Sequence, residues 1–141
     1  DMARKAGADL AINPRDGDVV AIVREATDGE GVDVLLEMSG AVSAIDQGFA
    51  LLKPGGEAAL LGVSSGPFSF DWNHHIVFKA AKIYGISGRK LWETWYQSRG
   101  LVRSGAVDLL PLITHRFKLE EYDQAFQTMT SGESGKVVLF P

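Results

Sequence analysis

Three short runs of small residues follow hydrophobic runs in the sequence, and their main-chain groups could bind the polar parts of a cofactor. The runs, each with its preceding hydrophobe, are Met38-Ser39-Gly40, Leu61-Gly62-Val63 and Ile86-Ser87-Gly88. Glycine and serine leave main-chain N–H and C=O groups accessible, and a nicotinamide carboxamide needs such partners. Each run alone is a weak signal, but together they favour a nicotinamide-cofactor site.

The third run continues into a cation and an aromatic segment. Arg89 follows Gly88 directly, and the segment Trp92-Glu93-Thr94-Trp95-Tyr96 comes next. The guanidinium of Arg89 could hold a pyrophosphate or a substrate carboxylate through its fork of donors. Two plainer interpretations stay open, namely a glycine turn before a core helix and a solvated arginine in the first turn of that helix.

Other kinds of site find little support. His74 and His75 are adjacent, so on a helix they diverge by about 100° and do not share a metal ion easily. His115 lies in an apolar context and is typical of a structural histidine. No G-x-S-x-G elbow or G-x-G-x-x-G fingerprint occurs, and the chain has no cysteine. The sequence therefore predicts neither catalytic nor metal-ligating residues within this chain.

Strands and helices are expected to alternate around these residues. Hydrophobic patterns predict strands at 8–12, 32–38, 57–63, 82–86, 113–117 and 136–140, with helices near 19–26, 45–52, 73–78, 91–102 and 122–129. Asp16 and Asn73 are the expected N-caps of two of the helices, and residues 53–56 are expected to form a turn. The continuous apolar run at 32–38 suggests a strand covered on both faces.

This alternation predicts an α/β fold with a parallel sheet, in which the three small-residue runs open on the same edge. Because the glycine fingerprint is absent, we expect a partial Rossmann-type doubly wound sheet without its first βαβ unit. The opening residues 1–7 are typical of the last turns of a helix that ends at Gly7. We therefore expect the carboxyl-terminal portion of a longer protein.

Composition limits the classes of partner. The 141 residues are 45% hydrophobic, which suits one globular core, and the net charge is −4 with 14 scattered Lys and Arg. Such a distribution argues against nucleic acid or an anionic membrane surface as a partner. The lack of cysteine, signal peptide and membrane-length apolar run leads us to expect a cytoplasmic protein.

Five segments together carry a resemblance to a known family: Leu36–Gly40, Leu60–Val63, Gly85–Arg89, Trp92–Tyr96 and Ile113–Phe117. They resemble the L-threonine 3-dehydrogenases, within the zinc-dependent medium-chain dehydrogenase/reductase superfamily. The resemblance implies that L-threonine is oxidised to 2-amino-3-oxobutanoate with hydride transfer to NAD, while zinc polarises the alcohol oxygen. It also implies cofactor contacts at Leu61, Gly62, Val63, Ile86, Ser87 and Arg89, and more weakly at Ser39 and Gly40.

The family's zinc ligands, glycine fingerprint and ribose-binding acid have no counterpart here. Residues 1–112 would then be the rear part of the NAD-binding domain, and residues 113–141 a segment returning to the catalytic domain. Such a chain is expected to be inactive alone and to form a homo-oligomer, a tetramer in the family's usual state, through the edge strand at 82–86. The alternatives are another alcohol or polyol dehydrogenase of the superfamily, or a non-catalytic nucleotide-binding or dimerisation module.

Overall fold

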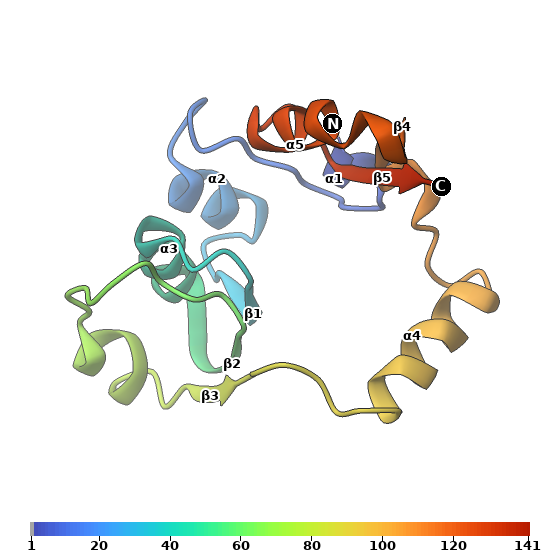
Figure 1. Cartoon of the computed structure of the whole chain (residues 1–141). Coiled ribbons are helices and arrows are strands. Elements are labelled where there is room, and N and C mark those ends of the chain that lie inside the picture. The colour runs from blue at the N-terminus through green and yellow to red at the C-terminus, as the bar shows by residue number, and fades with distance from the viewer. Residues whose placement is uncertain (1) are drawn as a thin grey trace. The chain divides into compact units, whose positions relative to one another are not determined.

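The computed structural model describes residues 2–141 as an α/β protein with parallel sheets (Figure 1). The helices are α1 (Met2–Lys5), α2 (Val19–Ala26), α3 (Val42–Leu51), α4 (Glu93–Arg103) and α5 (Tyr122–Thr130). The strands are β1 (Val32–Glu37), β2 (Leu52–Leu60), β3 (Lys82–Gly85), β4 (Ile113–Lys118) and β5 (Lys136–Phe140). Three short helical turns are η1 (Asn73–Val77), η2 (Leu110–Leu112) and η3 (Leu119–Glu121).

The chain divides into two compact units. The central unit is Ile12–Gly88, and the flanking unit combines the segment before it with Arg89–Pro141. In the central unit the sheet order is β1-β2-β3, and both pairings are parallel, as the sequence predicted. The register places Glu37 beside Leu60 and Leu60 beside Gly85, so the three carboxyl ends are level.

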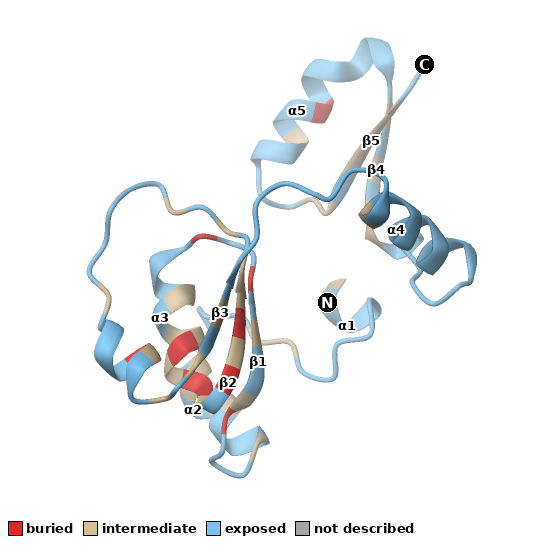
Figure 2. Ribbon diagram, turned by 90° about the horizontal axis from the view of Figure 1, so that it is seen from below, coloured by how far each residue is buried: buried red, intermediate tan, exposed pale blue. Residues whose placement is uncertain are grey.

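The core of the central unit lies between the sheet and α3. Phe49, Leu52 and Ala58 are 1%, 2% and 0% exposed, and Figure 2 shows the buried positions on α3 and β2. Phe49 also meets the Phe70 ring edge-on at a centroid distance of 5.1 Å. Burial of these large apolar surfaces is the main stabilising term of the unit.

The prediction that β1 is covered on both faces is wrong for the described residues. Val34 and Leu36 are 58% and 63% exposed, whereas Leu35 points to the opposite face, where it lies against Gly48 of α3. Successive side chains of a strand alternate between faces, and α3 packs against only one face of the sheet. An apolar run therefore indicated a parallel strand correctly but not how many layers cover it.

Several element boundaries differ from the expected ones. Residues 8–12 form no strand, and the cap of α2 is Asp18 rather than Asp16, with Asp18 Oδ1 accepting from Val20 N at 2.9 Å. The N-cap of η1 is Trp72 rather than Asn73, and the Asp71 carboxylate just before it accepts from His74 N at 3.0 Å. In each case two acidic or amide residues lie near the helix start, and the boundary differs from the expected one by only one or two residues.

The expected turn at 53–56 lies inside β2 as an irregularity. Leu52 pairs with Val32 and Glu57 with Val34, so β2 carries extra residues opposite one residue of β1. Proline lacks an N–H and is tolerated in a sheet at such a bulge, which is the position of Pro54. Gly55 supplies the positive φ of 76° there.

Two cations bind the carboxyl end of α3, where helix carbonyls lack intrahelical partners. Lys79 Nζ donates to the carbonyls of Phe49, Ala50 and Leu52 at 2.6, 3.2 and 2.7 Å. Arg24 Nη2 donates to Ala50 O at 3.1 Å. Desolvation, and then the nearby Arg24 charge, lower the pKa of Lys79.

The flanking unit contains a second parallel pair, β4 and β5, joined through α5. Ala125 of α5 is 4% exposed and is the buried apolar residue of this unit. The predicted aromatic side of α4 is open, since Trp92, Trp95 and Tyr96 are 69%, 56% and 59% exposed. Within residues 2–141, no helix combines the length and apolarity needed to cross a membrane.

We expect Lys79→Met to lower the free energy of unfolding by about 1–3 kcal/mol, because the carbonyls of Phe49 and Leu52 lose their charged donor and that of Ala50 keeps only Arg24. Urea unfolding followed by circular dichroism measures this. The control is Lys82→Met, which removes an exposed, solvent-screened ion pair with Glu57 and should lower stability less than Lys79→Met does. Equal losses in the two variants would contradict a special role for Lys79.

Candidate functional site

The ends of β1, β2 and β3 meet at one edge of the central sheet. The last pairs are Glu37 with Leu60 and Leu60 with Gly85. Hydrogen bonds continue just beyond them, because Ile86 N donates to Leu60 O at 2.9 Å, and Leu61 N to Glu37 O at 2.9 Å. We call the residues Ser39–Gly40, Leu61–Val63 and Ile86–Ser87 the strand-end edge. The predicted alignment of these three ends on one edge is confirmed.

A buried carboxylate organises the turn after β1. Glu37 is 4% exposed, and its Oε1 accepts from Ser39 N at 2.9 Å, from Ser39 Oγ at 2.6 Å and from Gly40 N at 3.0 Å. Ser39 Oγ in turn accepts from Ala41 N at 3.1 Å, immediately before α3 begins. The turn that carries Ser39 and Gly40 is therefore held in place by hydrogen bonds that its own N–H and O–H groups donate to the Glu37 carboxylate.

Hydrogen bonding keeps Glu37 ionised in this buried position. The Ser39 hydroxyl is the largest cause that lowers the pKa of Glu37, and the main-chain N–H groups of Ser39 and Gly40 add to it. Burial acts in the opposite direction but does not prevail. The strand-end edge thus contains a fixed negative charge whose oxygens are occupied by donors from the protein.

Two glycines allow the main chains of the first two strand ends to touch. Gly40 has a positive φ of 69°, and a Cβ there would overlap the main chain of Val63. A Cβ at Gly62 would overlap Gly40 N and Glu37 Oε2. Neither position has room for a side chain, so the backbone approach at this edge depends on both residues being glycine.

An apolar cavity of about 470 Å³ opens beside the strand-end edge. Its walls come from the strand ends, from α3 and from the segment before η1: Glu37, Gly62, Val63, Ile45, Phe49, Phe68, Phe70 and Trp72 are among them. Phe68, Phe70 and Trp72 alternate along the sequence and put three aromatic residues on the cavity wall without forming a strand.

Sequence reasoning missed Glu37 and this cavity. Glu37 was interpreted only as part of an apolar strand, although an acidic residue two positions after Leu35 lies on the same, inward face. A carboxylate on an inward face, followed directly by Ser-Gly, is a signal that would have identified it. The cavity depends on residues far apart in the sequence, and no local pattern marks it.

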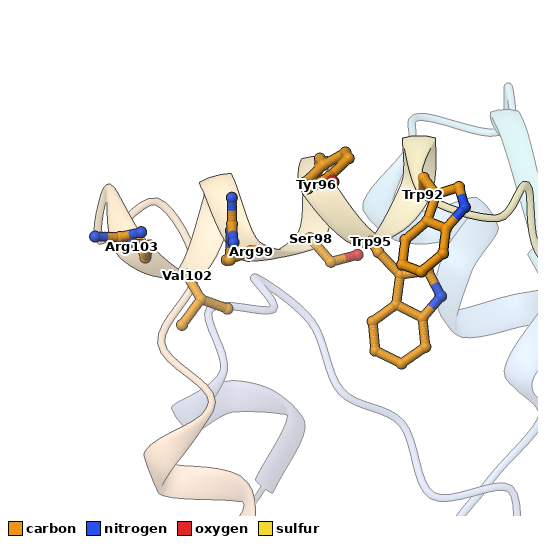
Figure 3. Close-up of a pocket in the computed structure, with 7 residues that line it drawn as sticks. All are labelled: Trp92, Trp95, Tyr96, Ser98, Arg99, Val102 and Arg103. Atoms are coloured by element: carbon orange, nitrogen blue, oxygen red, sulfur yellow. The ribbon is translucent and has the colours of Figure 1, made fainter.

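Arg89 lies in the flanking unit, whereas the other seven predicted cofactor-binding residues lie in the central unit. Its guanidinium carbon is 5.3 Å from the Trp95 ring centroid, which is cation–π distance. Along α4, a surface hollow of about 630 Å³ is lined by Trp92, Trp95, Tyr96, Ser98, Arg99, Val102 and Arg103 (Figure 3).

Zinc does not fit the residues that the structure describes. Between residues 2 and 141, no group of three or more histidine, cysteine, aspartate or glutamate side chains could hold a metal ion. His75 is buried, stacks on Phe70 at 5.0 Å and has Nε2 at 3.2 Å from Asp46 Oδ1. His74 and His75 therefore do not form a metal site, and no chemical step here is derived through zinc.

A nicotinamide cofactor, in contrast, suits the strand-end edge. Three adjacent strand ends present main-chain groups past the last sheet pairs, and the glycines at two of the ends let their main chains pack against each other. In open α/β sheets, ligands bind in the crevice beyond the carboxyl ends of the strands. The arrangement can position a planar, polar ligand group, but it contains no general acid or base directed at such a group.

Comparisons with known proteins agree with this geometry. The sequence profile described as zinc-binding dehydrogenase matches residues 1–104. An L-threonine 3-dehydrogenase of Pyrococcus abyssi is 50% identical over 139 residues, which cover 98% of this chain and 40% of the relative. Among solved structures, an alcohol dehydrogenase of Thermotoga maritima has a TM-score of 0.82 and 32% identity, covering 99% of this chain and 40% of its own.

A zinc-binding dehydrogenase of Sinorhizobium meliloti, solved with NADP bound, has a TM-score of 0.85 at 27% identity, covering 99% of this chain and 41% of its own. The chain thus spans about 40% of the length of the relatives it matches. It corresponds to a carboxyl-terminal portion of a zinc-dependent medium-chain dehydrogenase. The chain belongs to the zinc-binding dehydrogenase family.

Proposed function

We propose that this chain is the rear part of an NAD-dependent dehydrogenase that oxidises L-threonine to 2-amino-3-oxobutanoate, and that its strand-end edge binds the nicotinamide end of the cofactor. The observation that carries the proposal is that three parallel strands end at the same level. At two of these ends, a glycine packs directly against the main chain of the other end. The threonine preference is supported by the 50% identity to an L-threonine 3-dehydrogenase.

In this proposal the main chains of Leu61, Gly62, Val63, Ile86 and Ser87 hold the nicotinamide carboxamide. Ser39 and Gly40 line the neighbouring part of the cofactor. When bound, the nicotinamide ring supplies a hydride acceptor. The residues of this chain orient that ring, and the proposal assigns none of the described residues a zinc-binding role.

Arg89 has a separate role in the proposal, as a partner of a phosphate or a substrate carboxylate. Its planar guanidinium can make paired hydrogen bonds with either anion. The Trp95 ring beside it orients the guanidinium, and the cation–π contact leaves the N–H groups at its rim available.

Domain organisation and assembly form part of the same proposal. Residues 1–112 belong to the rear of the NAD-binding domain and residues 113–141 return to the catalytic domain. β3 pairs with β2 on one side and is the edge of the described sheet, which supports a homo-oligomer formed through the strand at 82–86, tetrameric in the complete enzyme. The location proposed is the cytoplasm.

Another alcohol or polyol dehydrogenase is the second candidate function. It is supported by fold similarity to an alcohol dehydrogenase at 32% identity and to a 2R,3R-butanediol dehydrogenase of Bacillus subtilis at 25% identity. The catalytic chemistry would be the same, and the difference lies in the alcohol that reaches the nicotinamide. A non-catalytic nucleotide-binding module is the third candidate, and it requires tight cofactor binding by this chain alone.

The substrate assignment is tested with the natural polypeptide that contains this chain. We expect L-threonine with NAD to give the highest kcat/KM when NADH absorbance is followed at saturating zinc, because an L-threonine 3-dehydrogenase is 50% identical to this chain over 139 residues. Butanediol and benzyl alcohol with NAD, and threonine with NADP, are the comparison reactions. A preference for either alcohol would replace threonine by the second candidate function.

The glycine contact is tested by Gly62→Ala. The added Cβ overlaps Gly40 N and Glu37 Oε2, so the strand ends must separate, and we expect NADH to bind at least about ten-fold more weakly. Nicotinamide fluorescence measures the affinity. Gly66→Ala is the matched control, because a Cβ at Gly66 has open space and this residue follows the same strand end. Equal NADH affinity in both variants would remove Gly62 from the site.

The isolated 141-residue chain provides a third test. We expect it to produce no NADH from L-threonine and NAD with added zinc, because the described residues include no metal-ligating group. Fluorescence of its three tryptophans during NAD titration reports cofactor binding at the same time. Threonine-dependent turnover by this chain would contradict the proposal, and tight NAD binding without turnover would favour the nucleotide-binding module.

A further inference from the structure

One residue connects the first two strand ends through both its side chain and its main chain. The Glu37 carboxylate accepts from Ser39 and Gly40 after β1, while the Glu37 carbonyl accepts from Leu61 N at 2.9 Å and Gly62 N at 3.1 Å after β2. The two groups of donors therefore share one acceptor residue. A shift of Glu37 would move both strand ends together.

The contacts of Glu37 favour a carboxylate over an amide. Three donor groups point at the carboxylate, and Oε2 also lies 3.2 Å from Gly40 N. A glutamine amide could keep one acceptor oxygen at the position of Oε1, but its NH₂ group would replace Oε2 and turn an N–H toward Gly40 N. An anion satisfies all of these donors, and hydrogen bonds to a charged acceptor are the stronger kind.

The position of Glu37 suits a residue that supports the strand-end edge from behind, not one that binds the cofactor directly. Its side chain is buried beneath Gly40 and Gly62 and forms part of the wall of the apolar cavity. Its Oε1 accepts from Ser39 N, Ser39 Oγ and Gly40 N, and its Oε2 shares the Gly40 N donor, so the contacts of the carboxylate in this structure are with the turn itself. Binding groups need to be held within about 0.5 Å of a productive geometry by a supporting shell of this kind.

We propose that Glu37 is a positioning residue, whose carboxylate holds the turn at Ser39–Gly40 against the main chain at Leu61–Gly62 and so fixes the strand-end edge for a nicotinamide cofactor. This inference rests on the proposed function. It assigns a role to a residue that makes no cofactor contact itself, and it explains why an acidic residue occupies an inward position of an otherwise apolar strand.

The test compares Glu37→Gln with the parent protein in the natural polypeptide that contains this chain. The matched control is Asp33→Asn, the same chemical change on the same strand at an exposed side chain. We expect Glu37→Gln to weaken NADH binding at least about ten-fold by nicotinamide fluorescence, and to raise KM for NAD more than it lowers kcat. The control is expected to leave both values unchanged.

A second measurement tests, without any cofactor, whether the Glu37 carboxylate holds the strand-end edge. We expect the amide hydrogens of Ser39, Gly40, Leu61 and Gly62 to exchange faster in Glu37→Gln than in the parent, while amides of α2 keep their rates. Exchange that is unchanged at all four amides would show that the carboxylate does not hold the edge.

The contribution of Glu37 to the stability of the folded protein is expected to decrease as the pH falls. Because the pKa of Glu37 is lowered in the folded protein, its stabilising contribution is complete above the ordinary glutamate pKa and is lost as the pH falls through the lowered value. The parent should therefore exceed Glu37→Gln in stability by a constant margin above about pH 5, and this margin should shrink below about pH 4. A margin that does not change with pH would contradict a role for the charge.

The outcomes separate the two proposals. If the parent binds NADH and Glu37→Gln binds it equally well, the positioning role is wrong while the proposed function stands. If the parent binds neither NADH nor NADPH, the proposed function is wrong, and the positioning role falls with it. If Glu37→Gln does not fold by circular dichroism, Ser39→Ala takes its place, with an expected loss of about three-fold in affinity. Unchanged affinity in a folded Ser39→Ala protein then overturns the inference.

Discussion

The contact between the ends of β1 and β2 is the constraint on which the candidate site depends. Glu37 accepts hydrogen bonds from residues on both ends, and Gly40 and Gly62 remove the side chains that would keep the ends apart. A buried anion is costly unless donors surround it, and the turn after β1 supplies them from the main chain. The same hydrogen bonds that make the charge acceptable also determine the shape of the edge.

Contacts at the carboxyl end of α3, away from the strand-end edge, also help to keep this edge in place. α3 begins just after the Glu37 turn, and its last carbonyls accept hydrogen bonds from Lys79 and Arg24. Phe49 and Leu52 near that end fill the core between α3 and the sheet. One helix therefore joins the core to the strand-end edge, so packing at a distance from the edge contributes to its geometry.

Much of the architecture followed from local pattern, and the failures have identifiable causes. Apolar runs bounded by glycine, proline and asparagine located five of the six expected strands and indicated that they run parallel, because a buried strand needs continuous hydrophobicity. Those patterns did not show that Val34 and Leu36 are exposed, since coverage depends on which face α3 packs against. The choice of Asp18 over Asp16 as a cap was equally open locally, because both residues could accept from the first turn.

For the candidate site, the sequence alone determined that three small-residue strand ends would lie on one edge, because strands joined by helical crossovers run parallel. It also indicated the dehydrogenase family through motifs at those ends. Only the tertiary structure showed that Glu37 serves two strand ends at once, that Gly40 and Gly62 pack against each other, and that three alternating aromatic residues line a cavity. These features join residues more than twenty positions apart, and the free energy of such contacts depends on distances that no local pattern encodes.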